Sequence, residues 1–152
     1  MSLDDTDRAL LTALQRDARL TNQQLGDSLH LSGSQAGRRR QALEADGVVQ
    51  GYRAHVDAAR AGLSVQAFVQ VVLTSHDRAH AADFLSHCHA SREVVSVWAL
   101  TGDADYLLRV YCADLGRFNA VLQNDLLQHP AVARVHSQIV LDQVKDDAAL
   151  PI

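Results

Sequence analysis

The stretch TNQQLGDSLHLSGSQAGRRRQALEADG, residues 21–47, decides the fold of the first part of the chain. Residues 21–24 and 32–35 are capping boxes, in which a Thr or Ser is followed three residues later by Gln, and this pattern predicts the start of a helix. Only a tight turn around His30 separates the two predicted helices, and Gly47 is typical of the position just after a helix end. Two helices joined in this way predict a helix-turn-helix.

Upstream of this stretch, residues 4–17 predict a further helix. Their apolar side chains recur at helical spacing, and three aspartates occupy the first turn, where the helix dipole favours negative charge. We therefore expect a three-helix domain over residues 1–50.

Downstream, residues 48–56 are predicted to form an extended strand, and a linker of residues 51–62 ends in a short turn at Gly62. Beyond the linker the patterning predicts strand 63–74, helix 77–89, strand 93–100, strand 106–112, helix 115–128 and strand 132–144. The order β-α-β-β-α-β is typical of the ferredoxin-like α+β fold. This second domain is expected over residues 63–145, followed by a tail of residues 146–152.

Two helices of such a fold cover one face of a four-stranded antiparallel sheet. The other face is expected to present a row of apolar side chains that nothing in the same chain covers. A second copy of the chain is the simplest cover, so the pattern predicts a homodimer.

Composition narrows the class of protein. The chain has 152 residues, 47% hydrophobic and 21% charged, which excludes a disordered chain. It contains no run of 18 apolar residues, and its acidic first residues lack the apolar core of a secretion signal, so we expect no membrane partner and a cytoplasmic protein. Cys88 and Cys112 are expected to be free thiols.

The formal net charge of −4 argues weakly against nucleic acid as a partner, but its distribution matters more than the sum. Residues 1–55 hold seven arginines and seven acidic residues and are therefore neutral. The net negative charge of the chain comes entirely from residues 56–152. The only basic run, Arg38 to Arg40, lies in the predicted helix-turn-helix.

A recognition helix reads DNA with residues near its N-terminal end, which enter the major groove. Gln can bind adenine and Arg can bind guanine with two hydrogen bonds each, whereas hydroxyl groups at helix starts suit phosphates. The candidate DNA-binding residues are Thr21, Asn22, Ser32, Ser34, Gln35, Arg38, Arg39 and Arg40. An ordinary helical hairpin with a solvated arginine run would show the same pattern.

Several stretches, taken in order, resemble one known family. They are LDDTDRALL at residues 3–11, the hairpin at 17–25, the recognition helix at 31–49, the linker at 51–54 and 62–63, TGDADYLL at 101–108, and finally Ser137 and Lys145. From Leu3 to Lys145 the chain resembles the Lrp/AsnC, or feast/famine, family of bacterial and archaeal transcription regulators.

This resemblance implies a winged helix-turn-helix joined by a strand to an effector-binding and oligomerisation domain of the RAM or ACT type. It also implies dimers that assemble further, often into octamers, and that respond to a small molecule, commonly an amino acid. We therefore interpret the chain as a sequence-specific DNA-binding transcriptional regulator. Its expected partners are double-stranded DNA, further copies of itself and a small-molecule effector, with no resident cofactor.

The recognition helix departs from the family pattern. Arg40 occupies a position that is usually apolar, so we expect it to extend outward and pair with Glu44, or else to reach a phosphate. Gly37 in mid-helix costs about 1 kcal/mol relative to Ala, and Ala36 replaces a larger side chain, so the helix is expected to be less stable. His30 stands where Gly is frequent, and His tolerates a left-handed backbone.

The resemblance places the effector near the turn of residues 101–105, at a contact between dimers. Asp103 or Asp105 could receive an ammonium group, and the backbone N–H of Gly102 a carboxylate. The candidate effector-binding residues are Leu100, Thr101, Gly102, Asp103, Ala104 and Asp105. Ala104 stands where many family members have an aromatic residue, so the pocket is expected to be roomier or to have lost its ligand. The alternative is that residues 101–105 are a plain hairpin turn without a ligand, since Gly and Asp favour turns.

The predicted helix 77–89 and its approach are rich in titratable side chains, namely His76, His80, Asp83, His87, Cys88 and His89. A metal site needs about three such ligands that converge. Half-exposed residues beside a buried stripe explain the pattern better, so no metal site is predicted, and a pH-responsive interface is the other alternative.

The sequence contains no nucleophile–base pair, phosphate-binding glycine loop or HExxH motif, so no catalytic residues are predicted. Sirohaem decarboxylases share the two-domain architecture, but residues 62–71 lack the Arg and His expected of such enzymes. An oligomerising ligand-binding module without DNA binding is the remaining alternative.

Overall fold

The computed structural model of the chain describes residues 2–75 and 77–152. These residues form two compact units: one contains the chain up to His55 together with Val144–Ile152, and the other contains Val56–Gln143. Within the described residues, no helix is both long and apolar enough to cross a membrane.

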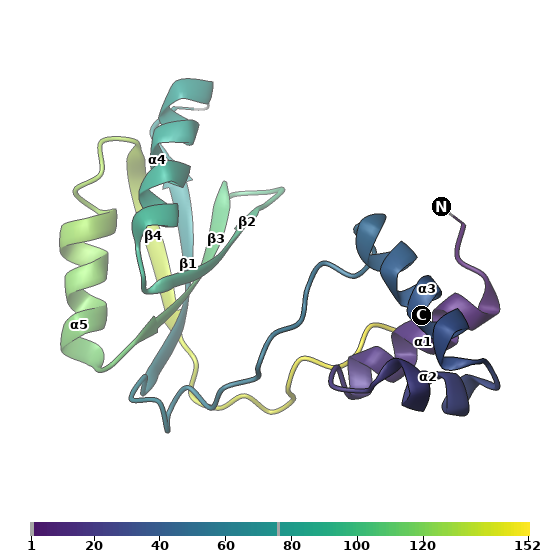
Figure 1. Cartoon of the computed structure of the whole chain (residues 1–152). Helices are drawn as coiled ribbons and strands as arrows, with labels where there is room; N and C mark the ends of the chain where they lie inside the picture. Colours follow the sequence, from purple (N-terminus) through teal and green to yellow (C-terminus); the bar gives the residue numbers. More distant parts are fainter. Residues whose placement is uncertain (1, 76) are drawn as a thin grey trace. The chain divides into compact units, whose positions relative to one another are not determined.

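The first unit contains three helices, α1 (Asp5–Arg16), α2 (Asn22–Leu29) and α3 (Gly33–Ala45), as the sequence predicts (Figure 1). Each begins at a complete capping box, formed by Asp4, Thr21 and Ser32 respectively. Their buried side chains form one core: Leu10, Leu11, Leu14, Leu25, Ala36 and Leu43.

The turn between α2 and α3 depends on unusual backbone geometry at two positions. His30 adopts φ 57° and ψ 38°, which confirms the left-handed turn expected there. Gly26 on α2 faces the turn so closely that an added Cβ would lie 2.7 Å from the carbonyl oxygen of Leu31. The absence of a side chain at Gly26 therefore lets the turn fold back onto α2.

The expected strand over residues 48–56 does not form, and the described part of the first unit contains no wing strand. A strand requires hydrogen bonds to a neighbouring strand, and the four strands found among the described residues pair only with one another. The described chain therefore has the predicted helix-turn-helix without the strand expected after it, because extended residues without a neighbouring strand form no backbone hydrogen bonds between strands.

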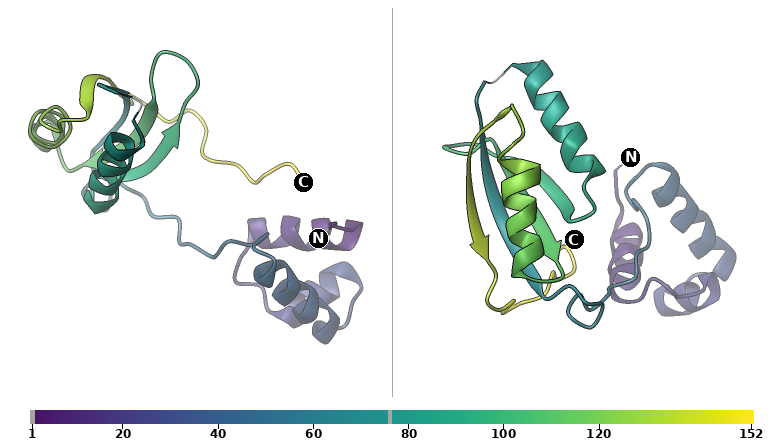
Figure 2. Two further views of the ribbon diagram at one scale, coloured as in Figure 1. Left: turned by 90° about the horizontal axis from the view of Figure 1, so that it is seen from above. Right: turned by 90° about the vertical axis from the view of Figure 1, so that its left-hand side faces the viewer.

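The second unit confirms the predicted ferredoxin-like order. Its elements are β1 (Val65–Leu73), α4 (Arg78–Ala90), β2 (Val94–Ala99), β3 (Tyr106–Cys112), α5 (Leu115–Ala120) with the π-helical turn η1 (Val121–Leu126), and β4 (Val132–Ile139). The strands pair antiparallel in the order β2-β3-β1-β4, and α4 and α5 lie on the same face of the sheet (Figure 2).

The last two elements end earlier than the sequence predicts. The helix changes to π-helical geometry at Val121 and ends at Leu126 instead of residue 128. Strand β4 ends at Ile139 instead of residue 144, because its partner β1 begins at Val65 and the final ladder contact is from the N–H of Val140 to the carbonyl of Gln66.

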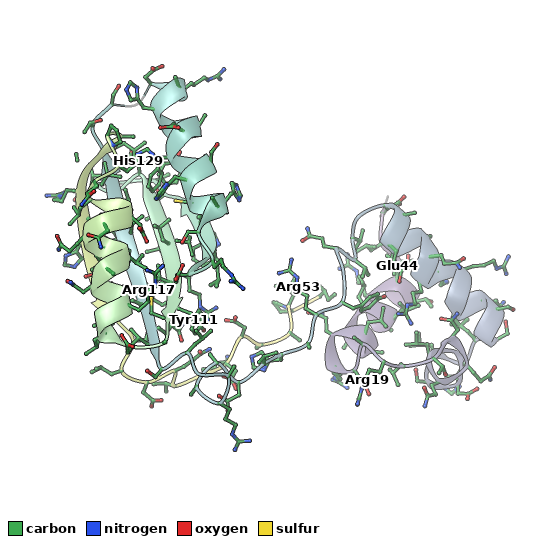
Figure 3. The ribbon with its side chains drawn as sticks, turned by 60° about the vertical axis from the view of Figure 1, so that its left-hand side comes forward. Arg19, Glu44, Arg53, Tyr111, Arg117 and His129 are labelled. Atoms are coloured by element: carbon green, nitrogen blue, oxygen red, sulfur yellow. The ribbon has the colours of Figure 1, made fainter. Side chains whose placement is uncertain are left out.

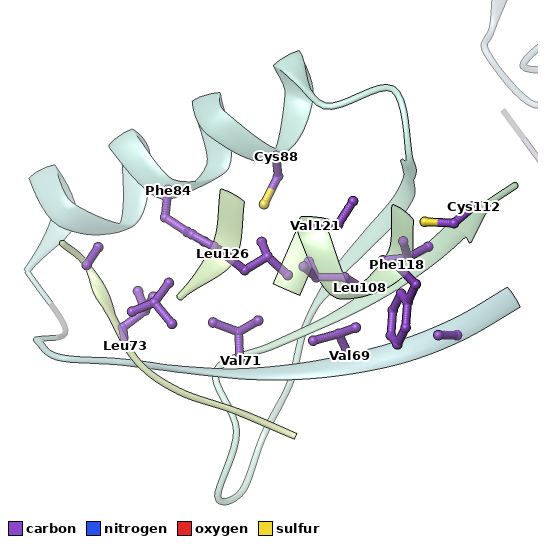
Figure 4. Packing of buried hydrophobic residues seen from close by; sticks show 14 of the residues in the cluster. Val69, Val71, Leu73, Phe84, Cys88, Leu108, Cys112, Phe118, Val121 and Leu126 are labelled. Atoms are coloured by element: carbon purple, nitrogen blue, oxygen red, sulfur yellow. The ribbon is translucent and has the colours of Figure 1, made fainter. Parts of the chain in front are cut away.

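The core of the second unit lies between the sheet and its two helices. Alternate residues of β1 are buried there, including Val69 and Val71, and they pack with Phe84 and Cys88 of α4 (Figure 4). Burial raises the pKa of the Cys88 thiol to about 11, which suppresses the reactive thiolate. Both cysteines are free, as predicted.

The uncovered face of the sheet differs from the predicted apolar row. The half-buried residues of β1 alternate with the core residues, and Gln66 and Gln70 share the outer face with Phe68 and Val72. In the register of the sheet, Phe68 lies between Arg109 of β3 and Gln138 of β4. The predicted row of apolar side chains is therefore only partly present, because polar side chains of β1, β3 and β4 lie among the apolar ones.

We expect the substitution Gly26→Ala to destabilise the first unit by about 1–3 kcal/mol, because the new methyl group would meet backbone. Gly37→Ala should change stability by less than about 1 kcal/mol, since its methyl group would meet only the movable side chain of Asn22 and alanine favours the helix. Urea unfolding followed by circular dichroism measures both, and equal losses would contradict the distinction.

Candidate DNA-binding surface and effector pocket

The start of α3 is held by a network of side-chain hydrogen bonds. The backbone N–H of Gln35 donates to Ser32 Oγ at 3.2 Å, and Gln35 Oε1 accepts from the Ser32 backbone N–H at 2.9 Å and from its hydroxyl at 3.0 Å. Ser34 Oγ lies 3.0 Å from Ser32 Oγ. The amide oxygen of Gln35 is therefore already engaged, so a two-bond contact with adenine would require it to leave the cap.

The other predicted phosphate-binding residues also have local roles. Thr21 Oγ1 accepts from the backbone N–H of Gln24 at 3.2 Å and retains its hydroxyl hydrogen for a further acceptor. Asn22 lies against α3, where an added Cβ at Gly37 would come within 2.8 Å of its amide nitrogen. Gly37 thus provides room for α2, a packing role that helix propensity alone does not indicate.

Arg39 turns toward α1. Its Nη1 donates to Asp7 Oδ1 at 2.7 Å and to Asp4 Oδ2 at 2.8 Å, and Asp7 is only 4% exposed. The pKa of the Asp4 carboxyl lies below its ordinary value, first because the backbone N–H of Asp7 donates to it and then because of Arg39. The hydrogen bonds of Arg39 to the Asp7 carboxylate and then to the Asp4 carboxylate raise the pKa of the Arg39 guanidinium. Arg39 therefore joins α3 to the first turn of α1.

Arg40 pairs with Glu44, as expected, but its side chain is only 22% exposed and so does not extend freely into solvent. Its Nε lies 3.1 Å from Glu44 Oε1 and 3.0 Å from the Tyr52 hydroxyl, its Nη1 donates to the carbonyl of Leu20 at 3.1 Å, and its guanidinium carbon lies 4.7 Å from the centre of the Tyr52 ring. Hydrogen bonds from Tyr52 and then Arg40 lower the pKa of Glu44, which is labelled in Figure 3. The sequence analysis did not single out Tyr52, because no periodicity relates it to α3.

Arg38 differs from both neighbours. It is exposed, and it has no hydrogen bond or ion pair with any part of the chain that the structure describes. Of the three consecutive arginines, only Arg38 therefore keeps its guanidinium available for a ligand outside the protein.

In the second unit, the turn of residues 101–105 is anchored by its last residue. Asp105 Oδ2 accepts from the backbone N–H of Leu73 at 2.8 Å, and the Asp105 backbone bonds to Val71 and Leu100, both at 2.9 Å. Gly102 has φ 110°, a backbone conformation that favours glycine. Asp105 thus holds the turn against the end of β1.

A pocket of about 300 Å³ lies beside this turn, on the uncovered face of the sheet. Its lining residues are Gln70, Val72, Asp103, Ala104, Arg134, Val135 and His136. Only Asp103 and Ala104 of the six predicted effector residues belong to this described lining. The sequence analysis missed Arg134 and His136. The pairing of β4 with β1 places them opposite Val72 and Gln70, so they could be found only once this pairing was known.

Several described histidines of the second unit lie close to acidic side chains or to one another. His80 Nδ1 lies 3.3 Å from Asp77, and His129, which the sequence analysis did not single out, has its Nε2 3.4 Å from Asp83 and its ring 5.1 Å from that of His87 (Figure 3). No group of three potential ligands converges within residues 2–75 and 77–152. His76 lies outside the described residues.

Comparison with known proteins gives the same two parts. Residues 3–44 match the AsnC-type helix-turn-helix domain, and residues 66–150 match the Lrp/AsnC ligand binding domain. Among relatives, the DNA-binding transcriptional activator DecR of Escherichia coli K12 is 32% identical, with 99% of each chain covered. The Bkd operon transcriptional regulator of Pseudomonas aeruginosa is 35% identical, covering 99% of this chain and 98% of its own.

Solved structures agree along the whole chain. The transcriptional regulator NMB0573 of Neisseria meningitidis, solved as an L-Met complex, has a TM-score of 0.93 and 35% identity, with 99% of this chain and 97% of that chain covered. An AsnC family regulator from Agrobacterium tumefaciens has a TM-score of 0.90 and 30% identity, with 98% and 97% covered.

A helix-turn-helix unit linked to an α+β ligand-binding domain defines a DNA-binding transcriptional regulator. The chain belongs to the Lrp/AsnC family of these regulators. The resemblance found in the sequence is thereby confirmed.

The lowered pKa of Asp4 predicts a pH dependence. Because this pKa is lower in the folded state, the charged carboxylate stabilises the first unit above its unfolded pKa, and the contribution is lost as pH falls below about 4. Asn can still cap a helix, so Asp4→Asn removes mainly the charge.

We expect Asp4→Asn to lower the melting temperature at pH 7 and the difference from the parent protein to shrink below about pH 4. Thermal unfolding followed by circular dichroism at several pH values measures this, with Asp5→Asn in the same turn as the matched control. A difference that does not change with pH would contradict the assigned charge effect.

Proposed function

We propose that this regulator binds operator DNA as a homodimer through the N-terminal half of α3, with Arg38 donating to guanine or phosphate. The observation that carries this proposal is that Arg38 alone among the three arginines has no partner in the described chain and is exposed. Ser34 and Gln35, one turn earlier on α3, complete the contacting surface, and Thr21 and Ser32 bind phosphates.

We further propose an amino acid as the effector, bound in the pocket beside Asp103. Asp103 and Arg134 place opposite charges around one pocket, and an amino acid presents an ammonium and a carboxylate group that fit this pair. The Neisseria relative, solved with L-Met, supports this ligand class. Ala104, being small, leaves room for the side chain of the effector.

Assembly connects the two functions in this proposal. The mixed face of the sheet has no cover among the described residues of the second unit itself, and a second copy would cover it. An effector that binds one assembly of dimers more tightly than another shifts the population toward it, which alters how the DNA-binding units are spaced and hence promoter occupancy.

Arg38→Ala should weaken binding to the DNA upstream of the regulator's own gene by about 1–3 kcal/mol while leaving the melting temperature unchanged. Arg39→Ala is the matched comparison, since it should lower the melting temperature by leaving the buried Asp7 carboxylate unpaired. Fluorescence anisotropy at two salt concentrations, against a scrambled fragment, measures affinity and its salt dependence. An unchanged dissociation constant for Arg38→Ala would rule out the groove contact.

Asp103→Ala should abolish the response of DNA binding to amino acids but leave folding and basal DNA affinity unchanged, because Asp103 lies in the pocket and not on α3. A screen of the twenty amino acids in the same anisotropy assay identifies the effector. Asp142→Ala, at an exposed aspartate of the same unit, serves as control. A full response in the Asp103 variant would show that the effector binds elsewhere.

A further inference from the structure

A groove of about 390 Å³ on the first unit has no role in the function proposed above. Apolar side chains of α1 and of the residues that follow α3 line it, among them Leu11, Leu14 and Val49. The groove also includes Leu150 and Ile152, from the segment of residues 144–152 that belongs to the same compact unit. We call residues 144–152 the tail.

The tail is held by a reciprocal pair of hydrogen bonds. The backbone N–H of Leu150 donates to Gln15 Oε1 at 2.6 Å, and Gln15 Nε2 donates to the carbonyl of Leu150 at 3.3 Å. A side-chain amide that both accepts a hydrogen bond from and donates one to the backbone of a single residue acts like a neighbouring strand. Such an amide binds the backbone of an extended peptide, whatever side chains the peptide carries.

Exposure along the chain distinguishes a free stretch from a docked one. Leu141 is 99% exposed and Val144 is 92% exposed, whereas Leu150 is 70% and Ile152 is 44% exposed. The exposed fraction thus decreases toward the end of the tail, although both residues that line the groove keep a substantial exposed fraction. In Figure 1 the end marked C lies beside α1, in keeping with the two hydrogen bonds to Gln15.

The groove adjoins the residues that support α3. Tyr52 lines it, and the hydroxyl of Tyr52 donates to Glu44 at 2.7 Å and lies 3.0 Å from Arg40 Nε. An occupant of the groove therefore packs beside the side chain that holds the second half of the recognition helix.

We propose that this groove is a peptide-binding site and that its occupant is the tail of the same chain, docked through Gln15 and the apolar floor of α1. The docked tail forms one wall of the groove, opposite Leu11 and Leu14 of α1 and beside residues 48–53. Because the chain passes from one unit to the other after His55 and again before Val144, the docked tail is a second connection to the DNA-binding unit.

Hydrogen–deuterium exchange of the full chain tests the docking. Gln15→Ala removes both hydrogen bonds, and deletion of residues 148–152 removes the occupant, so each should accelerate exchange of α1 and residues 48–53 by about tenfold. Arg16→Ala, at the next position of α1, and Leu141→Asp, at an exposed leucine, are the controls and should leave exchange unchanged. Equal exchange in all four variants and the parent protein would overturn the proposal.

Cross-linking identifies which chain supplies the tail. The variant Ile152→Cys is labelled with benzophenone, which leaves the buried Cys88 and Cys112 largely unreacted, and is irradiated as a mixture of ¹⁴N and ¹⁵N chains. We expect cross-links to residues 11–18 or 48–53 within chains of one isotope. Cross-links that join the two isotopes would assign the groove to a second copy and overturn the proposal, as would the absence of cross-links to these residues. Neither readout involves DNA or effector binding, so failure here is distinct from failure of the proposed function.

Discussion

The ion pair between Asp7 and Arg39 is the contact on which the DNA-binding unit depends. A carboxylate that is only 4% exposed is stable only when a cation and hydrogen bonds compensate for its lost hydration, and Arg39 supplies both. The pair joins the first turn of α1 to the middle of α3. Once Arg39 faces inward, the helical period turns Arg38 to solvent and Arg40 toward Glu44 and Tyr52. Three identical residues thereby acquire three different roles.

A comparable constraint shapes the second unit. Asp105 bonds to the end of β1, and this anchor leaves Asp103 at the rim of the pocket. The β1–β4 register then brings Arg134 beside it from a strand thirty residues later in the chain. The pocket is therefore a product of strand pairing as much as of the turn, and Asp103 and Arg134 line it together only when the sheet is formed.

Local signals predicted most of the fold. The capping boxes, the turn at His30 and the strand predicted over residues 63–74 depend on the types of residues close in sequence, and all are present as expected. The predictions that were wrong concern long-range pairing. Residues 48–56 lack a partner strand, and the last strand ends where β1 begins. The outer face of the sheet mixes polar with apolar residues because several strands contribute to it.

The sequence by itself determined the order of helices and strands, the two-domain organisation and the family resemblance, because caps, periodicity and motif spacing are encoded within short stretches. The tertiary structure alone decided which arginine of α3 has no partner within the described chain and which side chains line the pocket. Consecutive residues on a helix point in directions about 100° apart, so their roles depend on what packs against each face. For Arg39 and Arg40 those neighbours, Asp7 and Tyr52, come from other elements, and no pattern within α3 specifies them.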